Sequence, residues 1–478
     1  MGFEERLIIT LILVAGTILT LVLFRRSAVS TYVVIWLVFP KQGASVFGFE
    51  NIPQFAFVEL IGAIVLAVIA IRQRQPDSVT FGDFSFDPKL ISKSNKLLLL
   101  ICLMFFTQFL IGSLVVSNNQ GIHIDIPSGR LFVSISTEIS GLLFFYSCTR
   151  LLVTQKEVER ILIAFVLITF AMAIEFLAVT YAPQIFGSLR VFSFDLQGLF
   201  YSIFMNDFIL VGLTASIGSI ASLYFLRKNR GSLWVFGFLI CSILVLINFK
   251  RSVIAADILA IGIYLYFEYY RRWSVGLRML AVFFTIGMAI SFNPTTIATI
   301  TKSFSNSVTN NYISGRIQNF DNSDSVYSRF GIQLRAIEVM AESFPFGVGN
   351  NMLRYYMPGN SPKIFSPENH NVLDGYNKVS SHWGITESHN GYLEQVSSYG
   401  ILGLILMVVI IHTLLRNLLR GMRYSGQLRG LYGTTAGLLV LFGIFNIFLS
   451  YPRFYVALFF IFQLTNLIAA SRRTIGPG

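Results

Sequence analysis

The 478-residue chain has the composition of a protein that is embedded in a membrane. Hydrophobic residues make up 54% of it and charged residues only 13%, whereas a soluble domain carries roughly 25% charged residues. The net charge of +12 does not indicate nucleic-acid binding, because the basic residues stand in short clusters between apolar runs, as cytoplasmic anchors of membrane helices do. The composition therefore predicts a polytopic membrane protein with no nucleic-acid partner.

The apolar runs predict an all-α bundle of 12–13 transmembrane helices. A span needs ~20 apolar residues, and the second run is short enough to be tilted or fused to a neighbour, which is why the count is 12 or 13. In chain order the runs are Leu7–Phe24, Ala28–Phe39, Gln54–Ile71, Leu97–Val116, Leu131–Val153, Ile161–Tyr181, Leu199–Leu226, Leu233–Phe249, Val253–Tyr270, Ser274–Phe292, Ser398–Leu415, Leu431–Leu449 and Phe454–Ala470.

Lysine and arginine collect on one face of the membrane if these spans alternate in direction. By the positive-inside rule that face is the cytoplasm, and it also receives the C-terminus. The N-terminus then lies outside, a placement that depends on the short second run. The basic clusters are Arg25-Arg26, Arg72–Lys96, Lys156–Arg160, Arg227–Arg230, Arg271-Arg272, Arg416–Arg429 and Arg472-Arg473.

One large loop, residues 293–398, separates the helices of residues 1–292 from those of residues 399–478, and it lies on the outer side. Within it, apolar residues recur at helical spacing from Ser325 to Ser343, which predicts a short helix. The segment Phe344–Asn351 ends that helix. Its two glycines, Gly347 and Gly349, predict a sharp turn whose exposed N–H groups form an anion nest, a candidate substrate-binding element.

His389 is the best candidate for a catalytic base, since neutral imidazole is suited to take a proton from a hydroxyl group near neutral pH. It stands on the outer side just before a span, where a lipid head group and a water-borne acceptor can meet. Glu387 and Asn390 are near enough to orient it, and Tyr392 completes the candidate substrate-binding set around it. The alternative is an interfacial histidine that anchors the helix.

Three arginines lie on the same outer face. Arg251 follows Lys250 in a turn between two apolar runs, where a charge is costly unless it is paired or functional, and a guanidinium group binds phosphate in a bidentate fork. A cation at a helix end, reaching for the interface, is the alternative. Together with Arg190, Arg329 and His389, Arg251 would suit displacement of a diphosphate, with arginines on the leaving group and histidine on the acceptor. No metal-ligand spacing is present, so the sequence predicts neither a metal nor a cofactor.

These residues resemble the O-antigen ligase/polymerase superfamily. The stretch Glu387–Glu394, followed by Tyr399–Leu404, is similar to its HNxxL…GxxG signature. Arg329, Ala336 and Phe344–Asn350 resemble its R…A…P-x-G-x-G segment, and Lys250-Arg251-Ser252 resembles its "SR" element at the start of a helix, with Lys250 where the family usually has a small polar residue. Arg190 to Ala215 matches an arginine-led loop more loosely. The similarity covers about residues 185 to 450.

The resemblance implies a C-type glycosyltransferase-like bundle in the bacterial inner membrane, with the large loop in the periplasm. It implies transfer of a glycan from an undecaprenyl-pyrophosphate carrier without metal or nucleotide sugar. By matching motif, His389 would be the base, and Arg251 and Arg329 would bind the pyrophosphate.

We interpret the chain first as a polysaccharide polymerase, from the length of the loop and the Gly-Tyr-Leu-Glu stretch after His389. The acceptor is then a second lipid-linked glycan, and a chain-length regulator is a candidate partner besides the membrane lipids. An O-antigen ligase acting on a lipid A-core acceptor is the alternative. A transporter of polysaccharide or lipid is an alternative of another class, which Glu138, Glu175 and Asp257 within predicted spans keep open.

Overall fold

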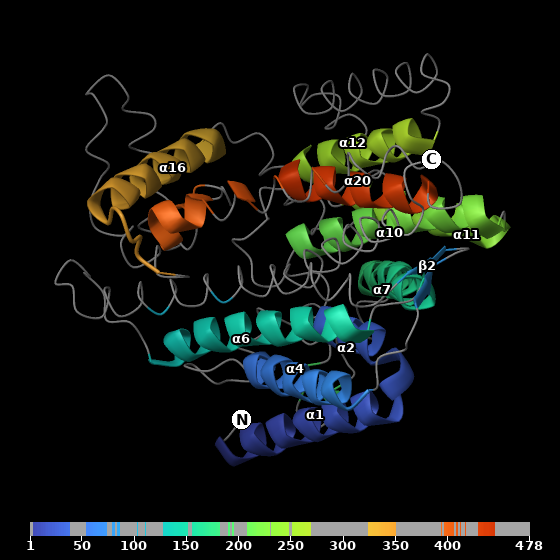
Figure 1. Ribbon diagram of the computed structural model, residues 1–478, viewed down its shortest axis with the longest axis horizontal. Helices are drawn as coiled ribbons and strands as arrows, with labels where there is room; N and C mark the ends of the chain where they lie inside the picture. The colour runs from blue at the N-terminus through green and yellow to red at the C-terminus, as the bar shows by residue number, and fades with distance from the viewer. Residues whose placement is uncertain are drawn as a thin grey trace.

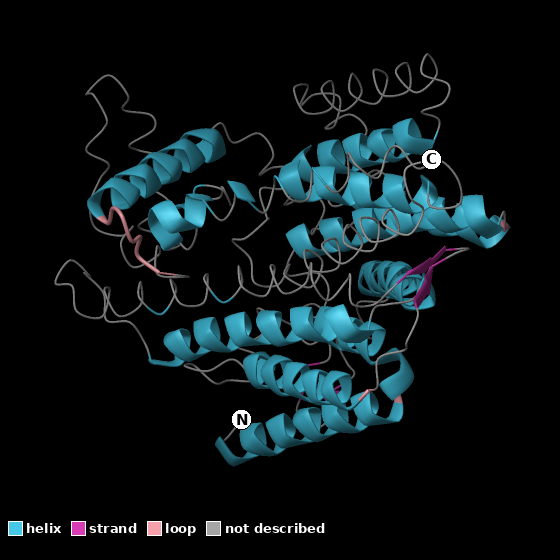
Figure 2. Cartoon of the chain, in the orientation of Figure 1, coloured by secondary structure: helices cyan, strands magenta, loops and turns pink. Residues whose placement is uncertain are grey.

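The computed structural model describes residues in twenty segments, in which helices predominate (Figures 1 and 2). The described residues are 3–38, 54–73, 79–81, 84–86, 103, 110, 128–151, 155–181, 190–191, 194–195, 208–229, 231–247, 251–268, 324–349, 393, 396–405, 408–409, 412, 416 and 429–444.

Ten α-helices with assigned bounds follow the predicted apolar runs and the predicted loop helix closely. They are α1 (Phe3–Leu23), α2 (Ala28–Val38), α4 (Gln54–Arg72), α6 (Ser128–Leu151), α7 (Gln155–Tyr181), α10 (Phe208–Asn229), α11 (Ser232–Ile247), α12 (Arg251–Glu268), α16 (Asp324–Glu342) and α20 (Arg429–Ile444). A further apolar helix, Val396–Ile405, begins the predicted run at Ser398. The runs Leu97–Val116, Ser274–Phe292 and Phe454–Ala470 lie almost wholly outside the described residues.

Two short antiparallel hairpins interrupt the helices and were not predicted. One pairs β1 (Val79–Phe81) with β2 (Phe84–Phe86). The other pairs β3 (Arg190–Val191) with β4 (Phe194–Asp195), so that Arg190 stands opposite Asp195. The described part of the chain is thus almost entirely helical, as the apolar runs indicated.

No single helix in the described part of the chain meets, on its own, the requirement of length and apolarity for crossing a bilayer. The pair Thr10–Leu23 and Arg25–Ile35 meets it jointly, with a bend of 87° between them. The bend falls at the 3-10 helix η1 (Arg25–Ser27), which holds the basic pair Arg25-Arg26.

Small residues allow the central helices to approach each other closely. Figure 1 shows α10, α12 and α20 lying side by side, and α12 packs against both of the others. A Cβ atom added to Gly437 of α20 would lie 2.9 Å from the Ala260 carbonyl oxygen of α12. Close backbone approach through glycine is the usual way in which membrane helices associate, and here it fixes the position of α12.

Hydroxyl groups in the helix interior are satisfied mainly by their own backbone. Thr169 donates to the Phe165 carbonyl at 2.8 Å, Ser140 to that of Ser136 at 2.7 Å and Thr434 to that of Gly430 at 2.9 Å. Each bond reaches back one turn, a pattern by which Ser and Thr side chains are accommodated in helices. Among the buried polar residues, Asp257 of α12 carries a carboxyl group, and Ser216 of α10 lies beside it.

Candidate functional site

The helix α16 carries the candidate residue Arg329 and precedes the turn that contains Gly347 and Gly349. It coincides with the predicted helix Ser325–Ser343. Of the apolar positions whose spacing predicted this helix, Ile337 is exposed, and Leu334 and Met340 are only partly buried. The buried face instead carries Ile332, Ala336 and Val339.

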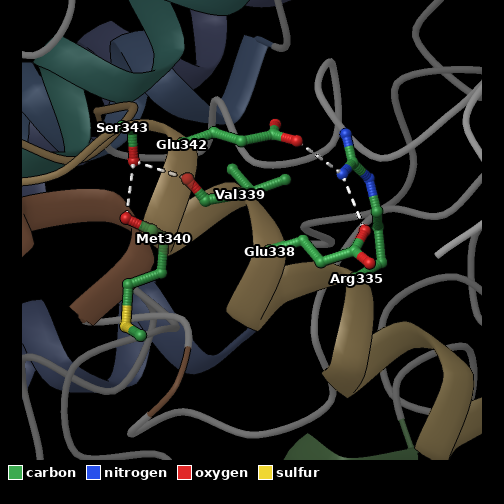
Figure 3. Close-up of polar contacts among 6 residues, drawn as sticks. All are labelled: Arg335, Glu338, Val339, Met340, Glu342 and Ser343. Carbon is green, nitrogen blue, oxygen red and sulfur yellow. Dashed lines mark hydrogen bonds and ion pairs between the residues drawn. The ribbon is translucent and has the colours of Figure 1, made fainter. Parts of the chain in front are cut away.

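A buried ion pair lies beside this apolar face of α16. Arg335 is 3% exposed and Glu338 7% exposed, and their side chains meet at 3.0 Å (Figure 3). The same guanidinium nitrogen of Arg335 donates to Glu342 Oε1 at 3.3 Å. Because a buried charge requires a close partner, the Glu338 carboxylate allows the Arg335 guanidinium group to be buried.

A compact turn follows α16 and forms backbone hydrogen bonds with the helix Val396–Ile405. The Ser343 carbonyl oxygen accepts hydrogen bonds from the N–H groups of Phe346 and Gly347, both at 3.1 Å. Beyond them, the Val348 N–H donates to the Ser397 carbonyl at 2.9 Å and the Gly349 N–H to the Ser398 carbonyl at 2.8 Å. We call the contact between residues 343–349 and residues 397–401 the junction.

The junction is also bonded in the opposite direction, from the helix to the turn. The Ile401 N–H donates to the Pro345 carbonyl at 3.0 Å. Gly400, next to it, has a φ of +60°, and a Cβ atom there would overlap the Pro345 carbonyl oxygen. Gly347 has a φ of +78°, and its Cβ atom would lie 2.6 Å from both the Ser398 oxygen and the Gly400 nitrogen. Both positions therefore require glycine.

The anion nest expected at Gly347 and Gly349 does not form. Each backbone N–H from Phe346 to Gly349 donates to a backbone carbonyl oxygen, so these groups are not directed at a ligand. The two glycines instead let the turn lie directly against the next helix. They support the site by joining two segments.

The structure places the three candidate arginines on three different elements. Arg251 is the first residue of α12, as the "SR" element at a helix start predicts, and Arg329 lies in the second turn of α16. Arg190 stands in β3. Their side chains are not among those described, and Lys250, Glu387, His389, Asn390 and Tyr392 lie outside the described residues.

Of the predicted site, the structure thus brings together two parts. Gly347 and Gly349, at the end of the helix that carries Arg329, contact the backbone of Ser397 and Ser398, which follow His389 by eight and nine residues. Within the described ranges, no three His, Cys, Asp or Glu residues are grouped as metal ligands would be. A site around Arg251, Arg329 and His389 remains a prediction.

The junction joins the two segments in which the sequence carries its most specific motifs, and a family model covers both. Residues 236–408 match the model described as O-antigen ligase. This stretch of the chain belongs to the O-antigen ligase/polymerase superfamily. The match spans less than half of the chain, from within α11 to the helix after His389, and leaves Arg190 outside. A search of curated proteins finds no match.

Members of the O-antigen ligase family are glycosyltransferase-like enzymes of the inner membrane that serve polysaccharide biosynthesis. They act on a lipid-linked glycan and an acceptor. Arg251, Arg329, Gly347 and His389 all lie within the matched stretch of this chain.

Sequence reasoning missed two features of this region. Gly400 was noted as part of a motif, but its contact with Pro345 was not expected; a lone glycine at the start of an apolar helix is a signal of close backbone approach. Arg335 was taken as an ordinary loop arginine. Its spacing of three residues from Glu338 and seven from Glu342 places all three on one side of a helix and could have indicated the ion pair.

Proposed function

We propose that this protein polymerises undecaprenyl-pyrophosphate-linked oligosaccharide units at the periplasmic face of the inner membrane. The acceptor hydroxyl oxygen attacks the anomeric carbon of the donor glycan. A carbon–oxygen bond forms there as the bond to the diphosphate oxygen breaks, and the carrier diphosphate leaves. The reaction uses neither a metal nor a nucleotide sugar.

The junction is the observation that carries this proposal. It fixes the end of α16 against the helix that follows His389 through three backbone hydrogen bonds of 2.8–3.0 Å. A transferase that handles a charged leaving group and an acceptor needs both sets of groups held in one geometry. The junction supplies such a connection between a segment that carries an arginine and a segment that carries a histidine.

Each candidate residue has one role in the proposed reaction. His389 removes the proton from the acceptor hydroxyl group, and Glu387 and Asn390 orient it. Arg329 and Arg251 bind the diphosphate and stabilise the charge that develops on it. Arg251 is helped by its position, since the first residues of α12 present unpaired N–H groups and the positive end of the helix dipole.

The histidine is tested by a pair of matched substitutions in purified protein supplied with lipid-linked glycan. His389→Ala should lower the rate of glycan transfer by a factor of about 10²–10⁴, the usual contribution of a general base. His412→Ala should leave the rate unchanged, because His412 is exposed and stands eleven residues beyond the junction in the sequence. Full activity in the His389 variant, with normal expression and elution, would remove the proposed base.

Ligation to lipid A-core is the second candidate, and the description of the matching family model as O-antigen ligase favours it. The same assay separates the two activities. Lipid-linked glycan alone should yield a ladder of lengthening chains if the protein is a polymerase. A single transfer that requires added lipid A-core would instead establish a ligase.

A further inference from the structure

The helix α16 leaves an apolar side chain exposed although it buries two charged ones. Arg335 and Glu338 are buried, at 3% and 7% exposure, beside the apolar Ile332, Ala336 and Val339, while Ile337 is 37% exposed. The turn after it continues this pattern, because Phe344 is 65% exposed and Phe346 50%. In water, burying the ion pair and exposing the apolar side chains would both be unfavourable. Such an arrangement is favourable where the outer side faces hydrocarbon.

The neighbouring helix has an exposed aliphatic stripe that runs away from the junction. Its members follow the spacing of one helix face and are between 40% and 56% exposed: Ile401, Leu404, Ile405, Val408 and Val409. Further along the same face, His412 and Arg416 are exposed as well. In a protein of an inner-membrane family, this is the composition of a face that meets lipid and ends at a basic interfacial residue.

The turn after α16 occupies the place where that stripe would continue toward the loop. Positions four and three residues before Ile401 are Ser397 and Ser398, which are buried beneath Val348 and Gly349. On the loop side of Ile401, the exposed apolar side chains are therefore Phe344 and Phe346, which belong to the turn. Because the Pro345 carbonyl between them accepts the Ile401 N–H, their backbone is fixed beside the first residue of the stripe.

A comparison of lengths shows what the two phenylalanines contribute. Ile401 and Arg416 are fifteen residue steps apart, which corresponds to about 22 Å at helical geometry. The hydrocarbon core of a bilayer is about 30 Å thick, so the stripe leaves several ångströms of apolar height uncovered on the side of the loop. Phe344 and Phe346 stand at that end.

We propose that Phe344 and Phe346 form an interfacial anchor that inserts into the leaflet on the side of the loop. The anchor continues the lipid-facing stripe of the adjoining helix and holds α16 at the membrane surface, with Ile337 toward the lipid. Its partner is the acyl-chain region of the bilayer. The proposal rests on membership of an inner-membrane family and is independent of the reaction proposed above.

The test measures the surroundings of each side chain directly. Single cysteines replace Phe344 or Phe346 in a chain whose three native cysteines are replaced, and each carries a nitroxide label in lipid nanodiscs. Collision with oxygen, which concentrates in hydrocarbon, is compared with collision with a water-soluble nickel chelate. Val408→Cys, 56% exposed on the stripe, is the reference for lipid, and Gln73→Cys, exposed just after α4 and far from the junction in the sequence, is the reference for water.

Both phenylalanine positions should resemble Val408, with an oxygen-to-nickel ratio several-fold above that of Gln73. A ratio like that of Gln73 would place the turn in water and overturn the anchor. Low collision with both reagents would show that protein covers the turn, such as a second copy, and would also overturn it. Because no glycan is present in this experiment, a failed anchor and a failed transferase assignment are distinguishable.

A second measurement does not depend on labelling. Phe344→Asp and Phe346→Asp should each lower the unfolding temperature in nanodiscs, because a carboxylate would replace an apolar group inside the bilayer. Gln73→Asp, at an exposed position just after α4, should leave the unfolding temperature nearly unchanged. Equal effects of all three aspartates would contradict an anchor that is specific to the two phenylalanines.

Discussion

At the scale of single residues, two glycines determine whether the junction can form. Gly347 and Gly400 both have positive φ, and each would place a Cβ atom against backbone atoms of the other segment. Side-chain rearrangement cannot relieve such contacts. The geometry of this region therefore depends on two positions that carry no side chain.

Gly347→Ala and Gly400→Ala should each reduce the free energy of unfolding by more than about 1–2 kcal/mol, the cost of the left-handed conformation alone for an L-residue. Thermal unfolding in detergent or nanodiscs measures the loss. Gly16→Ala is the matched control, since a Cβ atom at Gly16 meets nothing within 4 Å, and it should be neutral or slightly stabilising. A loss no larger than that of the control would mean that the junction is not maintained in solution.

The second prediction at this scale concerns the buried ion pair of α16. Arg335→Ala leaves the Glu338 carboxylate buried without its partner, and breaking such a pair costs about 3–5 kcal/mol. The double variant Arg335→Met with Glu338→Leu should recover most of that loss, because apolar residues of similar volume can replace a buried pair. Thermal unfolding of the single and double variants tests this; a double variant as unstable as the single one would contradict it.

Arg335 is consequently a poor control for the candidate arginines, although it stands in the same predicted loop as Arg329. Removing its side chain would destabilise α16, the helix that carries Arg329. Arg72, exposed at the end of α4, is a better control, because its loss should disturb neither the junction nor the α16 ion pair.

At the scale of elements, hydrophobic periodicity was sufficient to locate most helices but not to orient α16. Runs of apolar residues predicted the described helices to within a few residues at most ends. For α16 the spacing predicted a stripe of apolar positions but not which side is buried, and the structure buries Arg335 and Glu338 and exposes Ile337. Periodicity identifies two faces of a helix, and it does not say which solvent each face meets.

The junction could not be predicted from the sequence, for a different reason. The G-x-G spacing correctly indicated a sharp turn, but an anion nest and a backbone contact with another helix use the same N–H groups. Only the partner segment distinguishes the two, and Ser397 and Ser398 lie far from Gly349 in the sequence. The roles of Arg251, Arg329 and His389 came from a resemblance, and the described residues support only the setting of Arg251 and Arg329.

The element-scale prediction concerns how α12, which begins with Arg251, is held by α20. Gly437→Ala would bring a Cβ atom to 2.9 Å from the Ala260 carbonyl oxygen, and the helices would have to separate slightly. We expect a loss of about 1–3 kcal/mol in unfolding free energy, the usual cost of overpacking. Thermal unfolding of Gly437→Ala beside Gly16→Ala measures it. Equal stability of the two variants would show that α12 and α20 are not in contact at this point.

At the scale of the whole molecule, the enzyme assignment requires that residues of separate elements act on one diphosphate. Arg251 begins α12 and Arg329 lies on α16, and the family match covers both. If both guanidinium groups contact the same leaving group, removing either should weaken carrier binding. Hydrogen bonds to charged groups contribute about 1.5–3 kcal/mol each, or roughly 10- to 150-fold in affinity.

The dissociation constant of an undecaprenyl-pyrophosphate glycan should therefore rise in Arg251→Ala and in Arg329→Ala, and remain unchanged in Arg72→Ala. The double variant decides whether the two arginines share a ligand. Groups that act on one ligand are energetically coupled, so the loss in the double variant should differ from the sum of the single losses by about 0.5–3 kcal/mol. Strictly additive losses would mean that the two arginines serve separate places on the protein, and a single diphosphate site built from α12 and α16 would have to be abandoned.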